Sequence, residues 1–125
     1  MSKAFRLKPW RPNETLIVSA IMQALYYEQA QGRVCWANRM NSGATKYLDK
    51  KTGKERFVQF GFPGCPDIHG MMSDGRALYF EVKTETGVIS EHQQVFMDKV
   101  LAAGAVGGIV RSADEAVEIV RGAFA

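Results

Sequence analysis

Two acidic residues, Asp67 and Glu81, stand where the interior of a sheet would normally hold apolar side chains. Both belong to residues 64–83, which read GCPDIHGMMSDGRALYFEVK and contain two strand-like runs joined by a turn. The second run, 77–82, is almost wholly apolar and rich in aromatic and branched residues, as in a strand that is buried on both faces. Side chains alternate along a strand, so Lys83 shares a face with Glu81. A carboxylate buried in such a strand needs a partner.

The turn between the two runs determines which residues face each other. Residues 73–75, Ser-Asp-Gly, fit a three-residue hairpin loop in which the glycine takes the left-handed position. In that register His69 pairs with Tyr79. Two residues further on, Asp67 faces Glu81 on the same side of the sheet, with Cβ atoms about 4.5–5.5 Å apart.

Two carboxylates at this separation repel each other unless one is protonated or a cation lies between them. Mg²⁺ or Mn²⁺ would accept both, with water and phosphate oxygens completing its coordination. Lys83 would reach the same place as a point charge that orients an attacking water or stabilises charge on a phosphate. The alternative is an ordinary hairpin, in which Glu81 and Lys83 form a salt bridge at a solvated strand end and Asp67 is a turn residue. Spacing alone leaves both open.

The order of these motifs resembles that of a nuclease family. Pro66-Asp67, a hairpin and then Glu81-Val82-Lys83 resembles the PD-(D/E)XK nuclease signature. More narrowly, G-x-P-D at the start of a strand, E-V-K, and then Gly87, Ser90 and Gln93 resemble the VRR-NUC (virus-type replication-repair nuclease) family, over residues 14–119. Cys65 stands where an aliphatic or other small residue is expected, a departure that leaves the metal site intact.

This resemblance implies a metal site and a set of catalytic residues. It makes Asp67, Glu81 and the carbonyl of Val82 the ligands of Mg²⁺ or Mn²⁺, and Lys83 the catalytic lysine. Gln93 matches a glutamine on the helix after the lysine. Glu14 matches an acidic residue on the first helix of the family.

The resemblance also implies the fold and the partners. Arg39, Asn41 and Ser42 are similar to an R-x-N-S-G stretch that lies near the DNA. The implied fold is α/β, a restriction-endonuclease-like αβββαβ core with a mixed central sheet flanked by helices. Minimal family members resemble Holliday junction resolvases, so we expect a homodimer that cuts branched DNA.

Gln93 and Glu14 also have explanations that require no catalysis. Ser90 and Gln93 form the capping box S-x-x-Q at a helix start, which alone would account for both. Glu14 follows the N-cap residue Asn13, where an acidic side chain complements the helix dipole. Gln93, however, shares a helix face with Phe96, and this face must be buried against the sheet. A role in the site stays open for Gln93 and for Glu14.

Basic residues are concentrated in the first half of the chain. The protein carries a net charge of +3, but residues 1–56 hold 11 basic against 4 acidic residues, whereas residues 57–125 hold 5 against 9. The basic half is therefore the expected face toward a polyanion, although lysine-rich loops are also common as solvated surface. The expected DNA contacts are Lys46, Lys50, Lys51, Lys54 and Arg56.

At 125 residues the chain is expected to form one domain, with residues 1–13 as an N-terminal arm. Periodicity predicts a helix to about residue 31, a strand over 34–40 with Trp36 in the core, and a loop or hairpin over 42–55. A short strand over 56–60 precedes the central hairpin. A helix from Ser90 to Gly104, a strand over 106–110 and a helix opened by Ser112 complete the chain.

Several function classes are excluded. No apolar run approaches the ~20 residues of a membrane span, and the first residues lack the apolar core of a signal peptide. Cys35 and Cys65 have no zinc-binding spacing, so we expect an intracellular protein with reduced thiols and no small-molecule cofactor.

The sequence therefore predicts a Mg²⁺- or Mn²⁺-dependent DNA endonuclease. The alternative is a non-catalytic nucleic-acid-binding module within a replication, repair or restriction assembly. A hydrolase of small phosphates is a more distant possibility.

Overall fold

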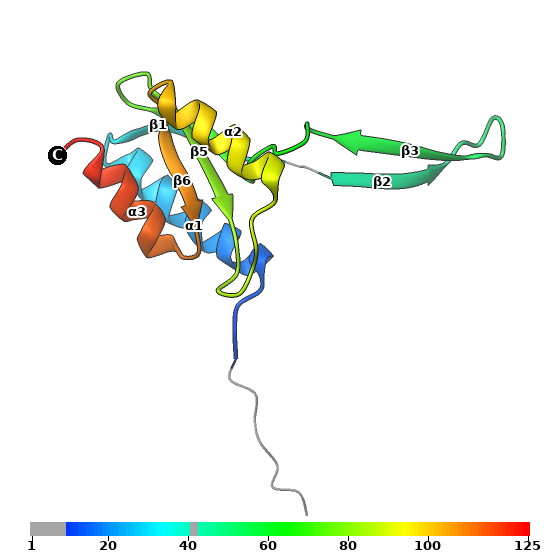
Figure 1. Ribbon diagram of the computed structural model, residues 1–125, viewed down its shortest axis with the longest axis horizontal. Coiled ribbons are helices and arrows are strands. Elements are labelled where there is room, and N and C mark those ends of the chain that lie inside the picture. Colours follow the sequence, from blue (N-terminus) through cyan, green and yellow to red (C-terminus); the bar gives the residue numbers. More distant parts are fainter. Residues whose placement is uncertain (1–9, 41–42) are drawn as a thin grey trace, which may run out of the picture.

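The computed structural model describes residues 10–40 and 43–125. In this part of the chain three helices and six strands follow one another (Figure 1): α1 (Glu14–Ala30), β1 (Val34–Arg39), β2 (Gly43–Leu48), β3 (Glu55–Phe60), β4 (Ile68–Met72), β5 (Ala77–Val82), α2 (Glu91–Ala102), β6 (Val106–Val110) and α3 (Ala113–Gly122). The predicted helices and strands are present with boundaries close to those expected.

Four of the strands form a mixed sheet in the order β1-β4-β5-β6. β4 runs antiparallel to both β1 and β5, whereas β6 runs parallel to β5. Parallel neighbours need a crossover, and α2 provides it. The protein is thus a mixed α/β fold, as the sequence predicts.

The β4–β5 hairpin has the predicted register. His69 pairs with Tyr79 and Met71 with Ala77. Gly75 adopts φ +93° in the turn, a conformation that L side chains rarely adopt. The glycine therefore sets the register that brings Asp67 and Glu81 to the same end of the hairpin.

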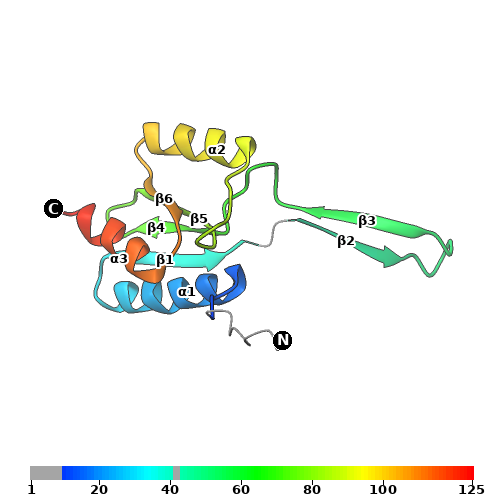
Figure 2. The ribbon, with the colours of Figure 1, turned by 60° about the horizontal axis from the view of Figure 1, so that its bottom comes forward.

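Helices cover both faces of the sheet. Figure 2 shows α1 and α3 on one side and α2 on the other. The main core lies on the α1–α3 side, where Leu78, Phe80 and Val82 of β5 are fully buried. On the α2 side, the rings of Tyr79 and Phe96 meet edge to face at 5.4 Å. The alternation along β5 therefore sends one side-chain row into the core and the row that includes Glu81 toward α2.

β2 and β3 form a separate two-stranded ribbon that projects from one end of the sheet (Figures 1 and 2). The predicted strand over 56–60 and the predicted loop or hairpin over 42–55 both fall in this ribbon. Among the ribbon side chains that the structure describes, Arg56 and Phe57 point to opposite faces and are both exposed, so neither face is packed on the core at these positions. We call residues 43–60 the ribbon below.

The prediction that Trp36 lies in the core is wrong. Its side chain is 37% exposed and its ring meets that of His69 edge to face at 5.2 Å. The cause is an irregularity in the pairing of β1 with β4 between Val34 and Trp36. Because it shifts the alternation by one residue, it turns Trp36 to the α2 side of the sheet, beyond the reach of that helix.

A buried ion cluster joins the ends of α1 and α3. Glu28 is 1% exposed, and its carboxylate accepts hydrogen bonds from Arg33 and from Nε of Arg121, the latter at 2.9 Å. Burial by itself would raise the pKa of Glu28, but the hydrogen bonds and charges of the two arginines outweigh it and lower the pKa. This cluster is structural and lies outside the predicted site.

Both cysteines are free, with Cys35 exposed and Cys65 buried. Among the described residues, none of the helices has the length and apolar character needed to cross a membrane.

Candidate active site

Several elements begin or end at one edge of the sheet. β4 begins there, the parallel pair β5 and β6 ends there, and β1 ends beside the start of β4. Figure 2 shows that α1 and α2 also begin at this end, from which the ribbon leaves. Strand ends and helix N-termini thus converge at the edge that carries Asp67 and Glu81.

Asp67 is held against both neighbouring strands. Its Oδ2 accepts a hydrogen bond of 2.8 Å from the backbone N–H of Val82 in β5. Its backbone carbonyl accepts one of 2.7 Å from Met40, which follows β1. These two bonds hold the carboxylate, which is partly exposed, beside the end of β5.

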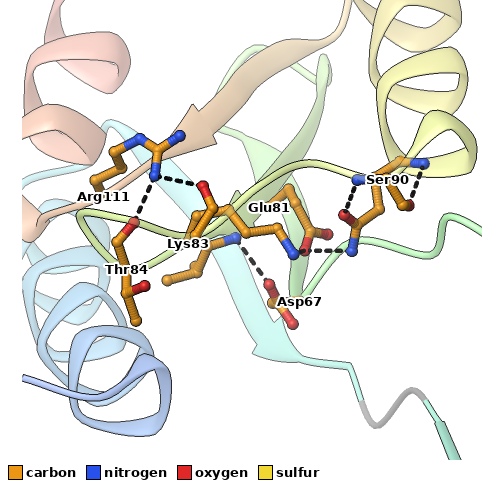
Figure 3. A network of polar contacts seen from close by, with 9 residues as sticks. Asp67, Glu81, Lys83, Thr84, Ser90 and Arg111 are labelled. Atoms are coloured by element: carbon orange, nitrogen blue, oxygen red, sulfur yellow. Dashed lines mark hydrogen bonds and ion pairs between the residues drawn. The ribbon is translucent and has the colours of Figure 1, made fainter.

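Glu81 is almost completely buried, with a relative exposure of 2%. Its Oε1 accepts a hydrogen bond of 2.9 Å from Nε2 of Gln93 and lies 3.6 Å from Nζ of Lys83. Its Oε2 is buried and has no hydrogen-bond partner among the described residues. Figure 3 shows Asp67, Glu81 and Lys83 converging at the end of β5. A buried carboxylate oxygen without a partner is costly, so this oxygen is free to accept a ligand.

The environment of Glu81 raises its pKa to about 8. Burial is the main cause, followed by the negative charge of the neighbouring Asp67 carboxylate. Lys83 acts in the opposite direction, and the charge of Glu14 adds a small increase. The site therefore lacks positive charge for the carboxylates that it holds.

Gln93 makes the helix cap and the site contact at the same time. Its Oε1 accepts a hydrogen bond of 3.0 Å from the backbone N–H of Ser90, and its own N–H is bonded to the hydroxyl of Ser90. The amide nitrogen at the other end of the side chain reaches Glu81. The helix-capping contacts of Gln93 and its contact with Glu81 are thus both present. An amide group has a donor and an acceptor end, and each end has its own partner here.

Gly64 permits the close approach of α2. A Cβ atom at this position would lie 2.3 Å from the backbone oxygen of His92, and its φ is +83°. Only glycine fits without displacing the first turn of α2, which carries Gln93. The motif G-x-P-D therefore supplies a helix-packing position as well as Asp67.

Val82 and Glu14 have less direct positions. The Val82 side chain is fully buried, and its N–H contacts Asp67. Glu14 is exposed at the start of α1 and is near enough for its charge to act on Glu81. Within residues 10–40 and 43–125, no group of three or more His, Cys, Asp or Glu side chains could hold a metal ion. The acidic centre of the described site is therefore the pair Asp67–Glu81.

This pair fits a hard divalent cation. Mg²⁺ is commonly bound through one or two carboxylates together with water and phosphate oxygens. The unpartnered Oε2 of Glu81 and the mutual effect of the two carboxyl groups are the observations that agree with such a ligand. Asp67 and Glu81 are the side chains that would hold it.

The predicted DNA-contacting residues are divided between two places. Arg39 is exposed at the end of β1, beside Asp67. Asn41 and Ser42 lie outside the described residues. The remaining five are exposed on the ribbon: Lys46, Lys50, Lys51, Lys54 and Arg56.

Arg111, which the sequence analysis missed, supports the chain that follows Lys83. Its guanidinium donates to the carbonyl oxygens of Thr84 and Gly87, the latter at 2.9 Å (Figure 3). The backbone N–H of Lys83 is bonded at 3.0 Å to the carbonyl of Val110, next to Arg111. Nothing local in the sequence indicates this role, because its partners lie more than twenty residues away.

A comparison of the chain with models of known protein families finds no match, and a comparison with curated proteins finds none either. The functional interpretation therefore depends on the geometry of the site and on the sequence motif.

Proposed function

We propose that the protein is a metal-dependent DNA endonuclease of the PD-(D/E)XK type, similar to the VRR-NUC family. The observation that carries the proposal is the Glu81 carboxylate, buried beside Asp67 with one oxygen that lacks a partner. An ordinary salt-bridged hairpin would leave Glu81 at a solvated strand end. The Glu81–Lys83 ion pair of that alternative is present, but the 2% exposure of Glu81 does not fit a solvated strand end.

The order of elements supports the same proposal. Apart from the ribbon, the chain runs α1, β1, β4, β5, α2, β6 and α3, which contains the αβββαβ series of a restriction-endonuclease-like core. In this interpretation the ribbon is an insertion between the first and second strands of the core. The proposed site then lies on the second and third strands, where the motif requires it.

Each side chain has a proposed task. Bound by Asp67, Glu81 and the Val82 carbonyl, Mg²⁺ or Mn²⁺ would neutralise charge on the phosphate and lower the pKa of a water. Lys83, with a side-chain exposure of 14%, places a positive charge 3.6 Å from Glu81 and would stabilise the charge that develops on the phosphate. Gln93 fixes the orientation of the Glu81 carboxylate through its amide nitrogen.

The ammonium group of Lys83 has a second effect. It compensates part of the negative charge at Glu81, which would otherwise disfavour the approach of a phosphodiester. A lysine suits this purpose because its charge is compact and its side chain rotates freely. Arg111 would keep the lysine in place by holding the chain that follows it.

The uneven charge supports DNA as the substrate. Arg39 is exposed at the end of the sheet that carries the carboxylates, and the ribbon with its exposed cations projects from the same end. We propose that the enzyme acts on branched DNA as a homodimer, because two copies would cut two strands symmetrically. Sedimentation that shows a monomer both with and without four-way DNA would contradict the dimer.

The test of catalysis compares the wild type with Lys83→Ala on labelled linear and four-way DNA in Mg²⁺ or Mn²⁺. We expect cleavage by the wild type and a loss of at least about 100-fold in the variant, since Lys83 acts on the reacting phosphate. Lys99→Ala, an exposed lysine on α2, is the matched control and should cleave like the wild type. DNA binding without cleavage by the wild type would instead favour the non-catalytic module.

A further inference from the structure

The ribbon carries an aromatic and a basic side chain on each of its two faces. Lys46 pairs with Phe57, and Tyr47 pairs with Arg56. Because neighbours along a strand point in opposite directions, these two pairs lie on opposite faces. Tyr47 is 50% exposed and Phe57 66% exposed, so the described chain leaves both rings largely open to solvent.

A ribbon of this kind needs a partner to cover it. An isolated two-stranded hairpin is marginally stable in water, and a grouping of exposed apolar side chains marks an interaction surface. Leu48, which shares a face with Phe57, is 63% exposed and enlarges the apolar part of that face. The charge and the position of the ribbon indicate which molecule covers it.

The charge of the ribbon favours a polyanion. Residues 43–60 contain five basic and two acidic side chains. Asp49 is paired with one of these cations, since its carboxylate accepts hydrogen bonds from Nε of Arg56 at 3.2 Å and from the N–H of Lys51 at 2.9 Å, and the ribbon keeps a net charge of +3. The lysines of the tip are exposed. A second ribbon, with the same positive charge, would be repelled.

The position and size of the ribbon fit double-stranded DNA. It leaves the sheet after β1 and returns to Asp67, so it projects from the end that carries the carboxylates (Figure 1). Strands of six residues extend about 20 Å, or about six base pairs. The major groove, about 12 Å wide, admits a two-stranded ribbon.

We infer that the β2–β3 ribbon lies in the major groove of a duplex arm next to the cleavage site. A ribbon that enters the groove with one edge toward the base pairs turns its two faces toward the two phosphate-lined walls, which fits the cation on each face. A surface for stacking unpaired bases would gather its aromatic rings on one face, and here they are on two. The inference rests on the proposed function, because it assumes that the DNA in the groove is the DNA at the carboxylates.

The first experiment measures binding by fluorescence anisotropy in chelator, where no cleavage occurs. The probes are a duplex of about 20 base pairs, two helical turns, and a single strand of the same length. The double variant Tyr47→Ala/Phe57→Ala should bind the duplex at least about tenfold more weakly, as expected when buried aromatic anchors are truncated. The single strand should be affected much less. Tyr26→Ala/Tyr27→Ala, with two exposed tyrosines of α1, is the control and should bind like the wild type.

A second variant covers the possibility that the aromatic substitutions unfold the ribbon. Lys50, Lys51 and Lys54 lie in the tip, outside the strand pairs, so changing all three to glutamine leaves the pairing residues intact. In a plot of the logarithm of duplex affinity against the logarithm of salt concentration, we expect the slope to become shallower by about 2–3. Each phosphate that a lysine no longer neutralises accounts for about 0.9 of this change.

Three results would overturn the inference: unchanged duplex binding by both variants, an equal loss on duplex and single strand, or conversion of a dimer into a monomer by the aromatic variant. The last would show that a second copy covers the ribbon. Failure of the proposed function is distinguishable, since it appears as a wild type that binds duplex through the ribbon and cuts neither linear nor four-way DNA in Mn²⁺.

Discussion

Replacing Glu81 with glutamine should stabilise the protein at alkaline pH while removing the proposed activity. Glutamine has nearly the shape of the protonated carboxyl, and its carbonyl oxygen can still accept the hydrogen bond from Gln93. It carries no charge, so the cost of ionising a buried group beside Asp67 disappears. A residue that a catalytic site requires would thus destabilise the fold that holds it.

The size of the effect follows from the raised pKa. An acid with a higher pKa in the folded protein contributes stability that is complete below its unfolded value and is lost as the pH rises through the folded value. For Glu81 this interval runs from 4.5 to about 8. At about 1.4 kcal/mol for each tenfold change in ionisation, the upper limit is about 5 kcal/mol. Relaxation and water penetration at the strand end reduce this to about 2–4 kcal/mol.

The assay is urea unfolding in chelator at several pH values. Between pH 4.5 and about 8.5, the free energy of unfolding of Glu81→Gln should rise relative to that of the wild type by about 2–4 kcal/mol. Mn²⁺ should stabilise the wild type, and more so at the alkaline end, because the ion requires the ionised carboxylate. Glu85→Gln, at an exposed position, is the control and should follow the wild type.

Two results would refute this reasoning. If Glu81→Gln is less stable than the wild type throughout the interval, the carboxylate is satisfied by contacts that an amide cannot make. If the two proteins show the same pH dependence, Glu81 titrates near its ordinary value, and its burial beside Asp67 has no energetic consequence.

Three further predictions concern the supports of the site and fold. Gly64→Ala should push against His92, displace the first turn of α2 and reduce the rate of cleavage by about 10–100-fold. Gly122→Ala is the control, because a Cβ there meets nothing within 4 Å, and it should cleave like the wild type. Equal cleavage rates for Gly64→Ala and the wild type would refute this prediction. Arg111→Lys should speed amide hydrogen exchange over residues 84–90 and slow cleavage about tenfold, because one ammonium group cannot reproduce the planar fork; unchanged exchange would show that the loop is held by other contacts. The pKa of Glu28 is lowered, so its contribution to stability is present above pH 4.5 and is lost as the pH falls below that value. Glu28→Gln should lower the free energy of unfolding in urea by about 2–3 kcal/mol at neutral pH and reduce the loss of stability at acid pH. An unchanged loss of stability at acid pH would count against the cluster.

Local signals in the sequence predict most of the elements around the site. The Ser-Asp-Gly turn determines the register of the β4–β5 hairpin, and the capping residues Asn13 and Ser90 determine where α1 and α2 begin. These features depend on contacts within a few residues, so single-sequence reasoning can recover them. The juxtaposition of Asp67 and Glu81 follows from the same turn.

The parts that escaped prediction depend on contacts between distant residues. Arg121 meets Glu28 across 93 positions of the chain, and Arg111 meets Thr84 across 27. Neither arginine belongs to a motif, so only the folded arrangement reveals its role. Trp36 was misplaced because one irregular step in β1 reverses the alternation on which the prediction depended.

The place where the ribbon enters the chain has a consequence for how such a protein could diversify. β1 and β4 are adjacent in the sheet, so a tight turn would suffice to join them, and residues 43–60 of the ribbon are free to vary in length. A longer, shorter or differently charged arm could be exchanged there while the sheet that holds the proposed site stays the same. Recognition could therefore be re-engineered in one contiguous segment, independently of the chemistry at the sheet edge.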